Sequence, residues 1–335
     1  MSLQSVENLM ADHIQKGEGF ITKFVDIGTG SGKLNNGVLQ AEKANEYMQA
    51  LQEATTFLDN TKLIPSHNHK RELDMMSFNV ELEAGRISGT PQTLNDYQDP
   101  NFVTRAFSAE EYRALTGLHR TTLYDSIEQK RLMNTLTQQF GEANGRALER
   151  VLIYGNTESE DATASTGYKV NDGILKKLQD DSTITPGEID LTDNTSNVLD
   201  EIRDVIDAFP DKYKDDGGLV MFVPRILTTT LRRYLADNKD ISESIAYITE
   251  EGNIKIEDVE LINVPAFSTP KNGYTEKPVI LTHRENIQWL ADPDNIIVES
   301  DFNLRSNKYD IASTMYADIQ FAFTDASMVA FLKEA

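Results

Sequence analysis

One segment restricts the possible folds of this chain more than any other, a long amphipathic stretch that begins at Asp125. Asp125 in the N-cap position and Glu128 three residues later form a capping box, and Gly155 with Asn156 mark the helix end. Its apolar stripe comprises Ile127, Leu132, Leu136, Phe140, Ala143, Ala147 and Val151. About 28 residues make a helix of roughly 42 Å, about twice the average length. We therefore predict a spine rather than a packing unit of a small sandwich.

The end of the chain has the clearest β pattern. From Tyr309 to Phe323 the odd positions are mostly apolar, while even positions such as Asp310 and Asp318 are polar. Fifteen residues at about 3.3 Å each make a strand of roughly 50 Å, long enough to lie alongside the predicted helix. We predict a hairpin partner at 295–299 and a connecting loop at 301–307.

A mixed unit is predicted between these two elements. Helices are expected at 197–208 and 225–236, and strands at 219–223, 253–257, 260–264 and 278–282. Residues 157–191 are rich in Thr, Ser, Asp and Gly, so we predict that they are mostly loop. The alternation of strands and helices indicates an α/β unit.

The first 124 residues are predicted to extend away from a compact core. Residues 1–37 lack periodicity and are interpreted as a flexible arm, and 38–58 show the spacing of an amphipathic helix. This helix must bury its stripe on the rest of the chain or on a neighbouring subunit. Residues 70–124 indicate β structure, with a strand at 112–123. They also contain a polar excursion too long for an ordinary connection, which favours disorder or a functional extension.

The composition excludes several classes of function. Fifty-four acidic residues against 32 basic ones leave a formal net charge of −22, which repels phosphate backbones and argues against specific nucleic-acid binding. The absence of cysteine excludes disulfides, Cys-ligated zinc, iron–sulfur clusters and thiol catalysis. No signal peptide opens the chain and no 18 apolar residues follow one another, so we expect a cytoplasmic product without a membrane partner.

No motif predicts catalysis. Residues 24–32, with Gly28, Gly30 and Gly32, resemble the glycine loop of S-adenosylmethionine-dependent methyltransferases, but no regular strand–helix alternation follows them. We therefore interpret them as part of the flexible arm. His67 and His69 have a spacing compatible with a metal but lack a third ligand. We predict no catalytic residue, no cofactor and no metal site.

Three segments, taken in order, carry a resemblance to a known family. Residues 107–116 and 123–126 look like a strand that returns from an extended loop and enters a spine helix. Residues 147–156 are similar to the exit of that helix, and 289–293 with 317–323 look like closing strands. This order resembles the major capsid proteins of tailed bacteriophages, the Hong Kong ninety-seven fold, from about Val38 to Phe331.

The resemblance implies an α+β fold divided into five regions. These are an N-terminal arm with an amphipathic helix (1–70), an extended E-loop with flanking strands of a peripheral (P) domain (71–124), the spine helix (125–156), an axial (A) domain (157–281) and terminal P-domain strands (282–335). The E-loop proper, 75–107, would lie over a neighbouring subunit, and the arm would reach a further one. Such segments lose conformational entropy when they become ordered. The surface that they bury on other copies of the chain offsets this loss.

The resemblance also implies a function without catalysis. The chain would be a phage major capsid protein that assembles through pentamers and hexamers in the host cytoplasm. The resulting icosahedral virion shell would enclose double-stranded DNA without sequence-specific binding. Its further partners would be a scaffolding protein, a portal and a decoration protein. Two alternatives stay open, an encapsulin-like bacterial nanocompartment shell, which shares the fold, and a methyltransferase dependent on S-adenosylmethionine.

Three arginines are the predicted inter-subunit contacts. Arg86 and Arg105 lie in the E-loop, and Arg305 lies in the loop of the terminal hairpin. Guanidinium groups on an acidic chain can bridge carboxylates of neighbouring copies. Some members of the resembled family form an isopeptide bond from a lysine in the E-loop. No lysine occurs between Met75 and Ser108, so we do not expect that cross-link here.

Overall fold

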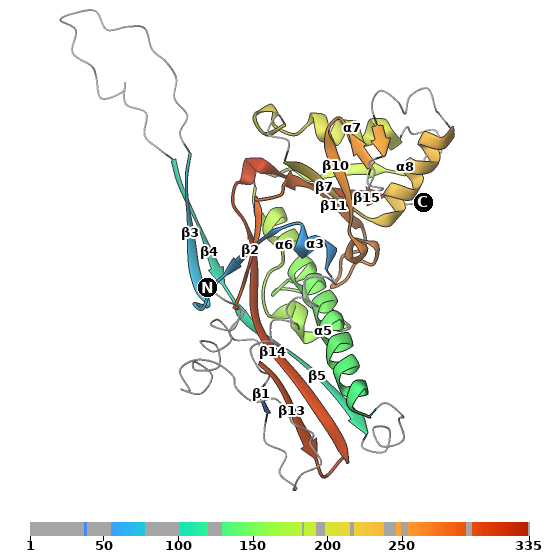
Figure 1. Ribbon diagram of the computed structural model, residues 1–335. Helices are drawn as coiled ribbons and strands as arrows, with labels where there is room; N and C mark the ends of the chain where they lie inside the picture. The colour runs from blue at the N-terminus through green and yellow to red at the C-terminus, as the bar shows by residue number, and fades with distance from the viewer. Residues whose placement is uncertain are drawn as a thin grey trace, which may run out of the picture.

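The computed structural model describes residues 37–38, 55–77, 101–119, 129–182, 184–191, 198–214, 218–237, 246–248, 254–292 and 297–333. Its strands form a six-stranded sheet, a seven-stranded sheet and a two-stranded ribbon (Figure 1). The described chain is α+β, as predicted. Most of the predicted arm helix, the glycine-rich stretch at 24–32 and Arg86 lie outside the described residues.

The six-stranded sheet is built around one long strand, β14. Its members are β1 (Gly37–Val38), β2 (Lys62–Pro65), β5 (Glu110–His119), β12 (Ile287–Ala291), β13 (Ile297–Asn303) and β14 (Lys308–Phe321). β14 pairs antiparallel with β13, β5 and β12, which confirms the predicted closing strand and hairpin partner. β13 continues to Asn303, opposite Lys308, so a short turn at 304–307 replaces the longer predicted loop. Asn307 has a φ of 50°, a conformation that Asn tolerates.

The predicted spine is helix α5 (Gln129–Tyr154), which runs along β14 in Figure 1. Its Leu148 and Leu152 belong to the same hydrophobic core as residues of β14. The buried face differs from the predicted stripe, because Ala143 and Ala147 are exposed. Asn144 and Glu149 are buried instead, since both polar side chains find partners inside the protein.

The seven-stranded sheet has the order β6-β15-β11-β7-β10-β9-β8. Its members are β6 (Gly187–Asp190), β7 (Leu219–Val223), β8 (Ala246–Ile248), β9 (Ile254–Ile256), β10 (Val259–Asn263), β11 (Lys277–His283) and β15 (Ser327–Lys333). Helices α7 (Val198–Asp207) and α8 (Arg225–Asp237) share one core cluster with this sheet. The predicted strands and helices of this unit are confirmed, with shifts of a few residues at their ends.

The segment predicted as loop, 157–191, contains two regular elements. α6 (Ile174–Asp180) buries Ile174, Leu175 and Leu178 completely, and β6 pairs parallel with β15. These elements are too short to show a period within their polar surroundings, which is why the pattern did not reveal them. Short 3-10 helices occur at Thr166–Lys169, Asp211–Tyr213, Pro265–Ser268 and Thr324–Ala326.

The C-terminal part of the chain crosses twice between the two sheets. β11 of the seven-stranded sheet leads to β12 of the six-stranded sheet, and β14 leads back to β15. The sequence prediction groups all of 282–335 with the long hairpin, whereas β15 pairs antiparallel with β11 in the other sheet. Alternation of apolar residues locates a strand but does not say which sheet receives it.

Asn286 joins these two crossings. Its side chain is 4% exposed, and Nδ2 lies 2.7–3.2 Å from four oxygens: Thr282 Oγ1, Phe323 O, Ala326 O and Ser327 Oγ. Its Oδ1 accepts the Phe323 N–H at 2.7 Å. The amide therefore holds the β11–β12 turn against the β14–β15 turn.

β3 (Lys70–Ser77) and β4 (Asn101–Ser108) form the two-stranded ribbon, which projects from the body in Figure 1. Met76 lies opposite Phe102 near its far end. At its base Phe107 is 1% exposed, and Ala109 leads directly into β5. The ribbon is thus a continuation of the strand that borders β14.

Helix α3 (Thr56–Asp59) and β2 place residues 56–65 within the body, although the sequence prediction assigns them to an arm. Phe57 is fully buried, and its ring lies 4.8 Å from the ring of Phe222 and 5.9 Å from that of Phe267. β2 pairs parallel with β12. The apolar side chains of α3 pack into the core beside the sheets. An arm that extended away from the body would leave them exposed to water.

Replacing Asn286 with alanine removes the amide from both crossings and leaves buried carbonyl groups without a donor. We expect Asn286→Ala to lower the free energy of unfolding by about 3 kcal/mol. Chemical denaturation of the unassembled subunit measures this change. Asn303→Ala is the control, because the Asn303 side chain is exposed; a similar loss in both variants would contradict the role of Asn286.

Candidate assembly site

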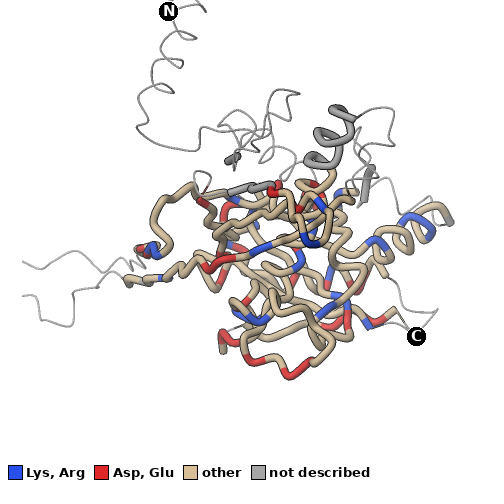
Figure 2. Tube along the Cα trace, turned by 90° about the horizontal axis from the view of Figure 1, so that it is seen from below, with Lys and Arg blue, Asp and Glu red and all other residues tan. Residues whose placement is uncertain are grey.

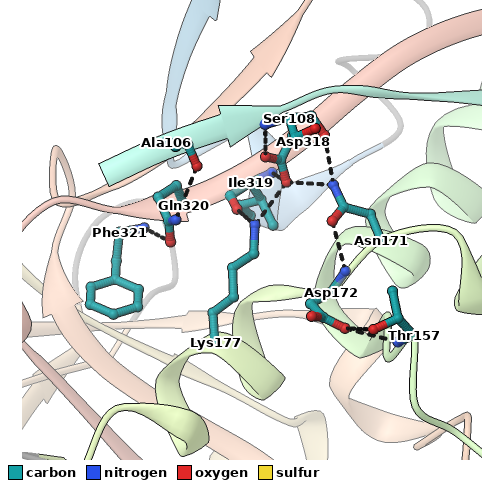
Figure 3. Close-up of polar contacts among 10 residues, drawn as sticks. All are labelled: Ala106, Ser108, Thr157, Asn171, Asp172, Lys177, Asp318, Ile319, Gln320 and Phe321. Atoms are coloured by element: carbon teal, nitrogen blue, oxygen red, sulfur yellow. Dashed lines mark hydrogen bonds and ion pairs between the residues drawn. The ribbon is translucent and has the colours of Figure 1, made fainter. Parts of the chain in front are cut away.

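A buried carboxylate on β14, that of Asp318, lies where the ribbon meets the body (Figure 3). Asp318 is 1% exposed. Its Oδ1 accepts hydrogen bonds from Lys177 Nζ and Asn171 Nδ2, each at 2.8 Å, and its Oδ2 accepts the Ser108 N–H at 2.8 Å. We call Ser108, Asn171, Lys177 and Asp318 the junction.

The junction satisfies the buried carboxylate of Asp318 and the partly buried ammonium group of Lys177 through hydrogen bonds among four separate segments. Lys177 Nζ also donates to the carbonyl oxygen of Ile319 at 2.6 Å, and Asn171 Nδ2 donates to that of Ser108 at 3.0 Å. The junction therefore joins the end of β4, the loop after α5, helix α6 and β14. A buried ion pair is stable only when such additional bonds satisfy both partners.

The loop after α5 is itself held in place next to the junction. Asn171 Oδ1 accepts the Asp172 N–H at 2.9 Å, and Asp172 Oδ1 accepts both the N–H and the hydroxyl of Thr157 (Figure 3). On the facing strand β5, burial and the nearby charges of Asp318 and Glu110 raise the pKa of Tyr112. Its phenol therefore stays protonated at neutral pH.

At the base of the ribbon, the guanidinium group of Arg105 contacts residues of its own chain. Its Nη2 donates to Asp181 Oδ2 at 3.0 Å and to Thr324 Oγ1 at 2.8 Å, and the guanidinium carbon lies 4.4 Å from the centre of the Phe321 ring. These contacts fasten β4 to α6 and to the β14–β15 turn. A contact of Arg105 with another subunit stays a prediction.

The structure does not bring the predicted arginines together. Arg105 lies at the Phe321 end of β14, whereas Arg305 is exposed in the turn before Lys308, at the opposite end. The Arg305 N–H donates to Asn303 Oδ1 at 3.1 Å. Arg86 lies outside the described residues. The inter-subunit roles of Arg86 and Arg305 therefore also stay predictions.

The two histidines with metal-like spacing face different partners. His67 Nδ1 lies 3.6 Å from Asp292 Oδ1, whereas the ring of His69 packs against that of Tyr316 with centroids 4.1 Å apart and planes tilted by 39°. Among the described residues no three His, Asp or Glu side chains gather as a metal site. No helix in that part of the chain is long and apolar enough to span a membrane.

Glu149 on α5 is a buried acid that sequence analysis missed. It is 4% exposed, and its Oε1 accepts the Phe57 N–H at 3.0 Å. Burial raises its pKa from 4.5 to about 7, against the smaller opposing effects of the Phe57 N–H and of Arg150. Glu149 therefore connects α3 to the spine helix. The predicted apolar stripe puts Glu149 on the opposite side of the helix, so no sequence pattern indicates its burial.

The far end of the ribbon exposes large apolar side chains. Met76 is 52% exposed and its cross-strand partner Phe102 is 67% exposed. A two-stranded ribbon has little stability alone in water, and an apolar pair at its end indicates a surface that another molecule covers. An exposed apolar pair at the end of a ribbon is suited to contact with another protein surface.

Comparison with known proteins relates the chain to phage capsids. No model of a known protein family matches it. It is 22% identical over 307 residues to the putative prophage capsid protein YqbE of Bacillus subtilis (strain 168), which covers 87% of this chain and 91% of the relative.

Solved structures agree with this relationship. The procapsid of satellite phage P4 with its size-determination protein matches with a TM-score of 0.58 and 14% identity, over 100% of this chain and 99% of that one. The capsid of an empty GTA particle matches with a TM-score of 0.53 and 12% identity, over 92% and 95%. Gordonia phage Cozz matches with a TM-score of 0.55 and 10% identity, over 83% and 86%. The chain therefore has the Hong Kong ninety-seven fold of tailed-phage major capsid proteins.

Removal of the Asp318 carboxylate leaves the Ser108 N–H without its acceptor and leaves Lys177 Nζ with only the Ile319 carbonyl oxygen. We expect Asp318→Ala to lower the free energy of unfolding by about 3–5 kcal/mol, measured by chemical denaturation of the unassembled subunit. Asp310→Ala on the same strand should cost less than about 1 kcal/mol, because its carboxylate is only partly buried. Equal losses in the two variants would rule out a special role for the junction.

The raised pKa of Glu149 makes folding sensitive to pH. Between about pH 4.5 and about pH 7 the unfolded chain releases this proton first, so the free energy of unfolding falls as pH rises, by about 3 kcal/mol in all. Glu149→Gln keeps an oxygen for the Phe57 N–H but cannot ionise. Denaturation curves of this variant should vary less with pH over this range, and an unchanged pH dependence would contradict the assignment.

Proposed function

We propose that this chain is the major capsid protein of a tailed bacteriophage, and that its copies assemble into a closed shell. The fold over nearly the whole chain and the prophage capsid relative support this function. The observation that carries the proposal within the molecule is the ribbon, whose apolar end has no cover among the described residues. A subunit that shields this end only by contacting another copy is suited to assembly.

The finer architecture belongs to the same proposal. Helix α5 and the six-stranded sheet would form most of the P domain, and the seven-stranded sheet with α7 and α8 would form the A domain around the axes of pentamers and hexamers. Residues 75–107 would form the E-loop, which lies over a neighbour, and the N-terminal arm would reach a further subunit. Each subunit alone thus leaves part of its apolar surface to be covered by neighbours.

The proposed shell encloses double-stranded DNA in the virion and assembles in the host cytoplasm. A net charge of −22 suits a wall that repels the packaged duplex rather than binding it. Scaffolding, portal and decoration proteins are the further partners that a phage shell of this kind would use.

Electron microscopy of the purified chain under assembly conditions tests this function. We expect rings or closed shells from the wild type. The double variant Met76→Ser/Phe102→Ser should reduce the yield of shells at least tenfold, because each subunit loses two apolar side chains worth about 1.5–3 kcal/mol each when buried. Its circular dichroism and melting temperature should stay close to those of the wild type, since both side chains are exposed in the monomer.

Glu72→Ser is the matched control, because Glu72 is an exposed polar residue on the same ribbon. It should assemble as the wild type does. Monomers alone from the wild type under every assembly condition would refute the proposed function. Normal shells from the double variant would refute only the role of the ribbon.

A further inference from the structure

The turn that closes the β13–β14 hairpin displays an apolar side chain to solvent. Leu304 is 84% exposed, the highest value among the large apolar side chains of the described residues. All of residues 303–307 are exposed, and in Figure 1 this turn lies at the opposite end of the subunit from the seven-stranded sheet. A single exposed leucine needs no partner by itself, but the charged side chains near this one form a complementary set.

Two acidic side chains oppose each other directly behind the turn. Asp301 of β13 pairs with Asp310 of β14 in the register of the hairpin. Asp310 Oδ2 accepts one hydrogen bond, from Asn303 Nδ2 at 3.2 Å, and neither carboxylate forms an ion pair within the described part of the chain. Like charges directly opposite each other on a sheet are destabilising, so this pair favours a positively charged partner.

The turn itself carries the opposite charge without delivering it to this pair. The Arg305 N–H donates to Asn303 Oδ1 at 3.1 Å, whereas the residue is exposed and its guanidinium group forms no ion pair with a described residue. Lys308, which lies opposite Asn303, forms none either. The hairpin end therefore holds acids and bases that leave one another unpaired.

Hydrogen bonds of Asn303 restrain the turn that presents Leu304 and Arg305. Besides the Arg305 N–H, Asn303 Oδ1 accepts the Ser306 N–H at 3.3 Å, while its Nδ2 donates to Asp310 on the other strand. Both side chains are thus displayed from a backbone that is already ordered. A contact made by such a turn loses less conformational entropy on binding than one made by a free loop.

The charges of the hairpin end cancel, in contrast to those of the whole chain. From Asp301 to Asp310 the sequence has two acidic and two basic residues, whereas the chain carries a net charge of −22. Copies of so acidic a protein repel one another, so a neutral end is a place where they can approach at lower electrostatic cost. Figure 2 views the subunit from the side of this end and shows acidic and basic positions interspersed along the described chain.

We propose that the hairpin ends of neighbouring copies meet, so that Arg305 of one copy bridges Asp301 and Asp310 of another. The inference rests on the proposed shell function and names the residues that would receive Arg305. A guanidinium group presents donors in a planar fork that fits carboxylates. Because each end carries both the donor and the acceptors, a symmetric contact satisfies every copy in the same way.

Leu304 gives this contact its shielded apolar part. An exposed ion pair contributes little by itself, whereas the leucines of the meeting ends would cover one another and exclude water beside the charges. The contact should nevertheless weaken as salt concentration rises, because salt screens charges near the surface.

A charge swap tests the contact. Arg305→Asp and Asp301→Arg should each reduce the yield of shells seen by electron microscopy at least tenfold, because like charges then face each other. Circular dichroism should stay unchanged, since both residues are exposed. The chain with both substitutions should recover assembly, because the two positions are complementary again.

Lys271→Asp is the matched control, because Lys271 is an exposed base in another turn of the chain. It makes the same change of net charge as Arg305→Asp and should assemble normally. Normal assembly of either single hairpin variant would overturn the contact. So would a double variant that folds but does not recover.

Cysteine variants test the contact directly, because the chain has no cysteine of its own. In shells assembled from equal amounts of Asp301→Cys and Arg305→Cys chains, mild oxidation should join the two chains into a dimer on a non-reducing gel. Lys271→Cys in place of Arg305→Cys should give no dimer. Well-formed mixed shells without the dimer would refute this inference alone, whereas a wild type that stays monomeric refutes the proposed function itself.

Discussion

The buried carboxylate of Asp318 is the interaction on which the arrangement of this subunit depends. It receives hydrogen bonds from the end of β4, from the loop after the spine helix and from α6, while it belongs to the long strand β14. Four segments that are far apart in sequence are therefore fixed relative to one another at a single point. Because charge inside a protein is tolerated only when it is paired, this contact selects one arrangement of the four.

The ribbon illustrates the consequence for assembly. Asp318 and Arg105 hold its base to the body, and the apolar pair Met76 and Phe102 lies near its far end. An extension with a fixed base and an apolar end can cover a neighbour without a large loss of conformational entropy on binding. The hydrogen bonds of Asn286 join the two chain crossings between the sheets, and so they help to hold the two sheets together.

Charge acts on two different scales in this chain. The overall excess of acidic residues governs the relation of the proposed shell to its packaged DNA, whereas inside the subunit the carboxylate of Asp318 is paired with Lys177. A strongly acidic protein repels its own copies at long range. Contacts between copies therefore need buried apolar surface, as proposed for the end of the ribbon.

The sequence by itself determined the long elements and their order, because a periodicity sustained over many residues reflects one buried face. It predicted α5, β14, β7 and α8 closely, and from that order the capsid fold. The tertiary structure alone decided four features. They are the junction, the hydrogen bond between Glu149 and the Phe57 N–H, the partner of Arg105 and the sheet to which β15 belongs. Each of them joins residues that are distant in sequence, and local patterns carry no information about which buried polar group will meet which partner.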